Sequence, residues 1–175
     1  MKLKITPNDR EIVMRDDDFI VSKTDPKGRI TYGNKIFIEF SGYEERDLIG
    51  KQHNVVRHPD MPRAVFHLLW SHIQSRQEIF AYVKNLCKDG SFYWVLANVT
   101  PSVDPQGNVL GYYSVRRKPN RKAVAYVTDL YRKMLEVERQ AGTKDAISAS
   151  TAHLETLLKE KGVTYEQFAL GLQAL

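Results

Sequence analysis

Two short segments near the N-terminus, residues 19–22 (Phe-Ile-Val-Ser) and 29–32 (Arg-Ile-Thr-Tyr), are rich in β-branched and aromatic residues, and polar and apolar residues alternate in the second of them. This composition is typical of short β-strands. Between the two segments, residues 25–28 read Asp-Pro-Lys-Gly, in which proline presets φ and glycine supplies a left-handed turn position. The pattern therefore predicts a β-hairpin.

Three longer strands are predicted after residue 78. The segments 79–87 and 91–101 are joined by residues 88–90, whose sequence Lys-Asp-Gly is typical of a hairpin turn. A Pro-Gln-Gly-Asn turn at residues 105–108 leads into a last strand over residues 109–117. The chain thus has a second group of strands, separated from the first hairpin by about 45 residues.

Helical spacing of apolar residues separates the two groups of strands. Asn34 is the predicted N-cap of a short helix that Gly42 ends, and residues 44–50 form one more turn. A longer helix is expected from about Pro62 to Ser75, because proline is tolerated in a first turn. Strands on both sides of a helical block predict an α+β fold: a five-stranded antiparallel sheet with helices on one face.

A C-terminal helical extension follows Pro119, with apolar stripes on each predicted helix. The stripes have two explanations. They pack onto the sheet or onto one another, which is the commoner case, or they form a dimer or partner surface. If they are a partner surface, removal of residues 121–175 should leave ligand binding intact. The predicted helices span 121–140, 145–161 and 164–174, with Gly142 ending the first.

Charge and cysteine content exclude several classes of protein. The net charge of +5 is spread along the 175 residues, so nucleic acid is not expected as a partner. The single cysteine, Cys87, excludes an internal disulfide and fits a reducing compartment. No apolar run approaches the roughly 18 residues of a membrane span, and no signal-peptide core is present. We therefore expect a cytoplasmic protein with no direct membrane insertion, associated with a membrane only through a partner.

Motifs of catalytic and metal sites are missing. The chain has no phosphate-binding loop, no glycine-rich dinucleotide fingerprint, no zinc-ligand spacing and no nucleophile elbow. His67 and His72 are five residues apart, not the four that would place two ligands on one helix face. We therefore expect neither an enzyme nor a metal site. The histidines that cluster in this region are His53, His58, His67 and His72.

Residues 52–62 combine one arginine, two histidines, one aspartate and one asparagine in a segment that its prolines make irregular. Packing alone does not explain such a loop. Arg57 is suited to hold an anionic group of a ligand through charge-assisted hydrogen bonds. Two alternatives remain open: Asp60 pairs with Arg57 and only fixes the loop, or the loop is simply solvated.

Asn85 shares one face of its predicted strand with Ala81 and Val83. A buried amide on an otherwise apolar face needs hydrogen-bond partners, and a planar heterocycle with carbonyl and imide edges would supply them. The alternative is that Asn85 is only the residue that precedes the turn. On the next strand, valine and alanine in the middle of one face leave room for a flat ligand.

Three segments in order resemble the PAS family. Residues 25–34 (DPKGRITYGN) are similar to its first hairpin, residues 41–50 contain its SGY and DLIG segments, and residues 88–94 (KDGSFYW) are similar to its later hairpin. The resemblance implies a PAS fold. It divides the chain into an N-terminal lead-in (1–17), a PAS sensor domain (18–118) and a helical C-terminal extension (119–175).

The sequence of residues 53–62, HNVVRHPDMP, resembles the signature of the PAS domains of aerotaxis receptors. Those domains bind FAD without a covalent bond and report redox state to the chemotaxis machinery. By register from Gly50, His53 stands where light-sensing PAS domains have a reactive cysteine, so photochemistry of that kind is not expected. The resemblance implies that eight residues bind the cofactor: Asn34, His53, Arg57, His58, Asp60, Phe66, Trp70 and Asn85.

The resemblance implies an FAD-binding redox or oxygen sensor without catalytic residues. The chain looks more like the stand-alone members of this family, which pair in trans with a membrane chemoreceptor or another signalling protein. A homodimer is a further option. Two alternatives stay open. One is a heme-binding gas sensor with His67 or His72 as axial ligand, and the other is a cofactor-free PAS module used for dimerisation.

Overall fold

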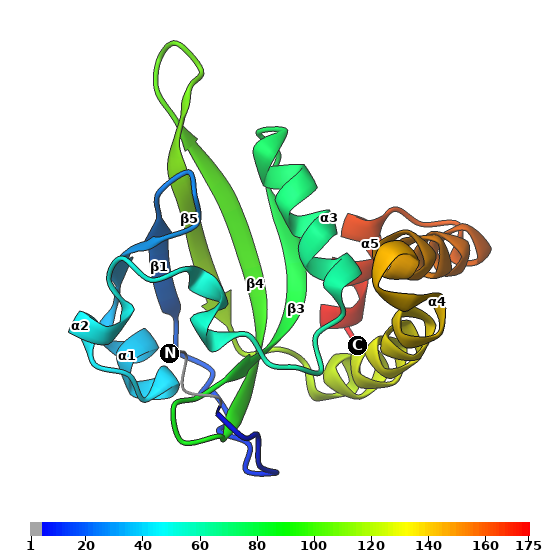
Figure 1. The fold of residues 1–175 in the computed structure, drawn as a ribbon, viewed down its shortest axis with the longest axis horizontal. Coiled ribbons are helices and arrows are strands. Elements are labelled where there is room, and N and C mark those ends of the chain that lie inside the picture. The colour runs from blue at the N-terminus through cyan, green and yellow to red at the C-terminus, as the bar shows by residue number, and fades with distance from the viewer. Residues whose placement is uncertain (1–4) are drawn as a thin grey trace.

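The computed structural model describes residues 5–175 and contains one five-stranded antiparallel sheet (Figure 1). The strand order is β2-β1-β5-β4-β3, so the last strand of the chain, β5, lies beside the first. The predicted α+β fold is confirmed. The strands are β1 (Ile20–Thr24), β2 (Ile30–Gly33), β3 (Ile79–Leu86), β4 (Phe92–Val103) and β5 (Val109–Arg117).

The strands agree with the segments predicted from the sequence, and β4 is longer than predicted. It continues beyond residue 101 because Ser102 pairs with Gly111 and Val103 with Val109 on β5. The resulting β4–β5 hairpin extends beyond the rest of the sheet (Figure 1). Antiparallel pairing of β5 with both β1 and β4 places the two groups of strands in a single sheet.

The helices between β2 and β3 cover one face of the sheet, called here the inner face. The side-chain oxygen of Asn34 caps the first of them by accepting from the backbone N–H of Phe37. Gly42 ends that helix with φ of 70°, a left-handed conformation that glycine adopts without strain. The elements are α1 (Lys35–Ser41), α2 (Glu45–Leu48), the 3-10 helix η1 (His53–Val56) and α3 (Arg63–Gln74).

The loop over residues 51–62 is more ordered than its sequence predicts. Besides η1, it forms isolated β-bridges from Gln52 to Arg29 and from Arg57 to Asn85. The second bridge fixes the loop to β3. The loop therefore lies as a strap across one end of the inner face.

The C-terminal helices cover the β3 edge of the sheet and reach its opposite, outer face. Helix α4 (Arg121–Lys161) is interrupted at Gly142, whose φ of 74° and ψ of 172° are not helical, and α5 (Tyr165–Gln173) follows. Figure 1 shows both helices gathered beside β3 and α3. The break falls where the sequence predicted a helix end, because glycine readily takes this conformation.

Two tyrosines connect these helices to β3. The hydroxyl of Tyr131 donates to the carbonyl of Tyr82 at 2.8 Å, and the hydroxyl of Tyr82 donates to the carbonyl of Ala169 at 3.0 Å. Trp94 on β4 packs against the ring of Tyr131, with ring centroids 6.1 Å apart. The apolar stripes of α4 and α5 therefore pack on the sheet. Within residues 5–175, no helix combines the length and apolar character that a membrane crossing requires.

Candidate functional site

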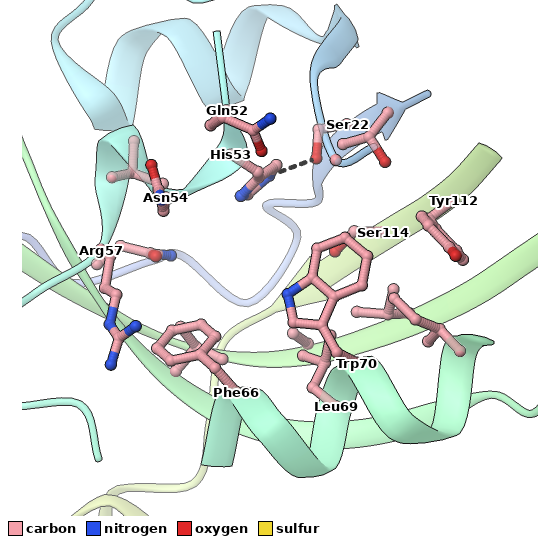
Figure 2. A pocket seen from close by; sticks show the side chains of 18 of the residues that line it. Ser22, Gln52, His53, Asn54, Arg57, Phe66, Leu69, Trp70, Tyr112 and Ser114 are labelled. Carbon is pink, nitrogen blue, oxygen red and sulfur yellow. Dashed lines mark hydrogen bonds between the residues drawn. The ribbon is translucent and has the colours of Figure 1, made fainter. Parts of the chain in front are cut away.

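A cavity of about 380 Å³ lies between the inner face of the sheet, η1 and α3 (Figure 2). Its volume falls in the range of about 300–1,000 Å³ that is usual for small-molecule sites. Side chains from β1, β3, β4 and β5 form its floor, and α3 forms one wall. Ile147, from the part of α4 beyond Gly142, also lines it.

Five of the eight candidate residues from the sequence line this cavity. They come from η1, the strap after it, α3 and β3, which are far apart in the sequence. In Figure 2, Phe66 and Trp70 extend from α3 into the space below His53. The five are His53, Arg57, Phe66, Trp70 and Asn85.

Asn34 does not line the cavity, because its side-chain amide forms hydrogen bonds with backbone groups. Its oxygen accepts from the N–H groups of Val21 at 3.0 Å and of Phe37 at 3.0 Å. Its nitrogen donates to the carbonyl of Phe19 at 2.8 Å. This side chain therefore joins the start of α1 to β1, and the structure gives it a role in the fold.

His58 and Asp60 also lie outside the cavity. His58 is buried, and its Nδ1 accepts from the backbone N–H of Asp60 at 3.0 Å. Asp60 is exposed and pairs with Lys84 at 2.7 Å, not with Arg57. The alternative in which Asp60 pairs with Arg57 is therefore wrong. Both residues fix the strap that carries Arg57.

His58 is expected to make folding sensitive to acid. Burial, with a smaller effect of the Lys84 charge, lowers the pKa of His58 to about 4. Its pKa in the unfolded chain is about 6.5, so stability is complete above that pH and falls as the pH drops towards 4, by up to about 1.4 kcal/mol per pH unit. His58→Asn keeps an acceptor for Asp60 without this titration. Urea unfolding between pH 4.5 and 7 should give a shallower pH dependence for the variant, and equal slopes would contradict this role.

Arg57 is half-buried at the edge of the cavity. Its guanidinium lies over the ring of Phe66, 4.2 Å from the centroid, and donates to the carbonyl of Met61 at 3.2 Å. Burial lowers the pKa of Arg57, but no carboxylate pairs with it directly among the described residues. The remaining guanidinium N–H groups are placed to bind an anionic group.

The wall formed by α3 is aromatic. Phe66 and Trp70 are four residues apart, so they lie on the same side of the helix. The indole of Trp70 packs edge-on against Tyr112 of β5, with centroids 5.5 Å apart. This contact fixes the ring in the wall, which gives the cavity an apolar side suited to a flat, conjugated ligand.

Asn85 is 3% exposed, and its Nδ2 has no hydrogen-bond partner within the described part of the chain. Buried amide nitrogens are nearly always paired in native proteins, so this nitrogen is available to donate to a molecule in the cavity. The position of Asn85 on the inner face agrees with the strand alternation. It is not only a residue that precedes a turn.

Arg116 on β5 is a cavity residue that the sequence analysis missed. It is 2% exposed, and its guanidinium donates to Ser22 Oγ and lies 3.5 Å from Nε2 of His53. Its Nε has no partner in the described residues. Burial lowers the pKa of Arg116 to about 10, which leaves the group charged at pH 7. The signal was present in the alternation of β5, which places Tyr112, Ser114 and Arg116 on one face.

His53 is neutral at physiological pH. Burial, together with the positive charge of Arg116, lowers the pKa of His53 to about 3. Its Nε2 forms a hydrogen bond with the hydroxyl of Ser22 at 3.0 Å, drawn in Figure 2. Its ring stacks on Phe37, so it is a fixed polar group in the roof of the cavity. No cluster of three or more His, Cys, Asp or Glu side chains suited to a metal occurs in residues 5–175.

Comparison with known protein families decides which fold family this architecture represents. The model described as the PAS fold matches residues 30–116. The chain contains a PAS domain. The predicted family is thus confirmed, and the matched region includes η1, α3 and the inner faces of β3 to β5 that surround the cavity.

The relatives of this PAS domain are signalling proteins. The aerotaxis receptor of Escherichia coli K12 is 40% identical over 119 residues, which are 68% of this chain and 23% of the receptor. The nitrogen fixation regulatory protein of Klebsiella pneumoniae is 29% identical over 97 residues, 55% of this chain and 20% of that protein. The chain therefore spans less than a quarter of either relative.

Solved structures agree on the PAS fold alone. The light-state LOV domain of the blue-light photoreceptor Aureochrome1 has a TM-score of 0.55 at 19% identity, covering 70% of this chain and 93% of that chain. A PAS domain from Colwellia psychrerythraea has a TM-score of 0.53 at 21% identity, covering 57% and 85%. The overall fold is thus shared with domains of distant sequence.

Proposed function

We propose that this PAS domain binds FAD in its cavity and reports the redox state of that flavin to a signalling partner. One observation carries the proposal. Two buried nitrogens in the floor of the cavity, Asn85 Nδ2 and Arg116 Nε, have no hydrogen-bond partner among the described residues. The identity to the aerotaxis receptor, which covers the same region, supports it.

The residues of the cavity fit a flavin ring. The ring is flat, with one apolar end and one edge rich in carbonyl and imide groups. Trp70 and Phe66 supply an aromatic wall, and Asn85 and Arg116 supply donors for carbonyl oxygens. Arg57, at the edge of the cavity, is suited to a phosphate of the same cofactor. A bound flavin supplies electron-transfer chemistry, and the protein supplies binding, orientation and electrostatics.

The contact between α3 and α4 provides a route from the cavity to the C-terminal helices. The carboxylate of Glu138 on α4 is buried and accepts from the first backbone N–H groups of α3, those of Arg63 at 3.1 Å and Ala64 at 3.0 Å. A carboxylate at a helix N-terminus is favoured by the unpaired N–H groups and the helix dipole. Because α3 also carries Phe66 and Trp70, a displacement of this helix by the ligand is passed to α4.

The partner in this proposal is a chemotaxis receptor or a similar signalling protein in trans, with a second copy of the chain as an alternative. The outer layer of α4 and α5 carries the signal because it contacts both α3 and the sheet. The redox state of the flavin changes which hydrogen bonds its ring makes, and Asn85 is able to reorient since an amide both donates and accepts.

The heme alternative has less support from the geometry. His72 is not among the residues that line the cavity, and its Nδ1 contacts the carbonyl of Leu68 on its own helix at 2.9 Å. His67 lines the cavity but is exposed at its rim. A visible spectrum of the purified chain separates the three options: flavin bands, an intense Soret band, or no colour for a cofactor-free module. Release by heat and chromatography then identifies FAD.

Arg57→Ala is expected to fold and to lose most of its FAD. The loss of a charge-assisted contact to phosphate costs about 1.5–3 kcal/mol, which corresponds to roughly 10–150-fold in affinity. The measurement is the ratio of flavin to protein absorbance together with a titration of the apoprotein. Arg132→Ala, on the exposed side of α4, is the matched control. Wild-type loading of Arg57→Ala would show that the strap does not hold the cofactor.

A further inference from the structure

The cavity has an unbalanced positive charge. Among the residues that line it are Arg57, Arg63 and Arg116, but no aspartate or glutamate. Near the rim, Arg63 is exposed to solvent and Arg57 donates to the carbonyl of Met61. Arg116 differs because it is 2% exposed and no carboxylate in residues 5–175 forms an ion pair with it. A buried cation without a carboxylate partner lowers the stability of the folded protein, so a charged residue at this position needs an explanation.

The groups around Arg116 are neutral and come from three different elements. Ser22 on β1 accepts from its guanidinium, and His53 on η1 lies 3.5 Å away. Tyr93 on β4 is the other titratable group that interacts with it, and burial raises the pKa of Tyr93, so the phenol is un-ionised at pH 7. The ring of Phe37 lies beneath the guanidinium, 4.8 Å from centroid to carbon. None of these groups neutralises the charge.

We propose that Arg116 is the residue that discriminates between the redox states of the cofactor: it pairs with a negative charge on the reduced flavin ring. This inference rests on the proposed function. A ring that takes up two electrons from a soluble donor and one proton from water, which bonds to a ring nitrogen, carries one net negative charge. The oxidised ring is neutral. The cavity therefore binds the reduced form more tightly and raises the reduction potential of the bound flavin.

Arg57 and Arg63 discriminate less strongly between the oxidised and the reduced flavin ring. Arg57 lies over Phe66 and donates to the carbonyl of Met61, and Arg63 is exposed. Water screens charges at the rim, whereas a charge in a low-dielectric interior acts on its neighbour at close to full strength. Arg116 is the cation that lies within the sheet floor of the cavity.

The test compares Arg116→Met and Arg116→Gln, which remove the charge, with Arg116→Lys, which keeps it. Arg117→Met is the matched control because Arg117 is the next residue on β5 and is exposed on the outer face. The dissociation constants of oxidised FAD and of dithionite-reduced FAD are measured for each protein, together with the midpoint potential of the bound flavin.

Removal of the charge should weaken binding of reduced FAD at least tenfold more than binding of oxidised FAD. For a two-electron couple, that tenfold change lowers the midpoint potential by about 30 mV. Arg116→Lys should keep most of the wild-type potential, and Arg117→Met should keep all of it. The flavin-free Arg116→Met protein should have a Tm at or above that of wild type, because a buried unpaired charge is removed while Ser22 and His53 keep their mutual bond.

The outcomes separate this inference from the proposed function. If wild type binds flavin in neither redox state, the proposed function is wrong. If wild type binds flavin and both charge-removing variants keep its potential, only the assignment of Arg116 is wrong. Equal weakening of oxidised and reduced FAD binding in the folded variants would overturn it too, since Arg116 would then serve both states equally. An unfolded Arg116→Met protein would show a structural guanidinium and also overturn it.

Discussion

A chain that ends at Asn120 is expected to lose its cooperative unfolding transition. The outer face of the sheet carries Tyr82, Trp94 and Leu96, which are 2%, 7% and 1% exposed in the full chain. Removal of α4 and α5 would expose them to water. At about 1.5–3 kcal/mol for each large apolar side chain, the loss is about 5–9 kcal/mol, comparable with the total stability of about 5–15 kcal/mol for a small domain.

The truncation also removes Glu138, the acceptor for the first N–H groups of α3. The helix that carries Phe66 and Trp70 would then begin without a cap, at a further cost of about 1 kcal/mol. Circular dichroism melting and flavin content measure the result, and a chain that ends at Gly162 is the control because it keeps all of α4. A folded, flavin-loaded chain 1–120 would show that the C-terminal helices are a separate partner surface, as one reading of the sequence allowed.

Asn85→Asp is expected to reduce FAD affinity at least about 100-fold while the protein stays folded. The amide nitrogen of Asn85 is buried, and an ionised carboxylate in its place cannot donate to a flavin carbonyl. The new charge must also be desolvated when the ligand fills the cavity, which adds to the roughly 1–3 kcal/mol for a lost buried hydrogen bond. Asn85→Ser keeps a shorter donor and should retain part of the binding.

The matched control for this substitution is Asn120→Asp. Asn120 caps α4 by accepting from the N–H groups of Lys122 and Ala123, and aspartate is equally good at such a position. Flavin titrations of the two aspartate variants therefore compare the same chemical change inside and outside the cavity. Limited proteolysis of oxidised and reduced samples adds a second readout. Equal affinities in both variants would place the ligand away from β3.

Local patterns in the sequence were sufficient to predict most of the helices and strands of the fold. Alternation, turn residues and helix caps are properties of neighbouring residues, which explains why Asn34, Gly42 and Gly142 were identified at element ends. The strap was harder to predict because its order depends on a bridge between Arg57 and Asn85, 28 residues apart. The positions of α4 and α5 were left open for the same reason: a stripe does not identify the surface that it covers.

The candidate site was partly predictable for a similar reason. The loop composition and a strand face pointed to Arg57 and Asn85, whereas Phe66 and Trp70 followed only from the family resemblance, and all four line the cavity. His58 occurs in the same motif but supports the strap through a backbone hydrogen bond. Arg116 was overlooked because a charged residue near the end of a strand is usually solvated, and Arg117 beside it is exposed. Only the assembled sheet distinguishes the two.

The interruption of α4 at Gly142 has a thermodynamic consequence for the ligand. The segment before the break lies against the outer face, and the segment after it supplies Ile147 to the cavity wall. One helix therefore belongs to both layers of the protein. A ligand that binds only the folded cavity adds RT ln(1 + [L]/Kd) to the free energy of unfolding, and part of this free energy must be overcome before the second segment of α4 can detach. Occupancy of the cavity thus lowers the equilibrium fraction of molecules in which this segment is detached, and a protease or a partner protein can sense that fraction without contacting the ligand.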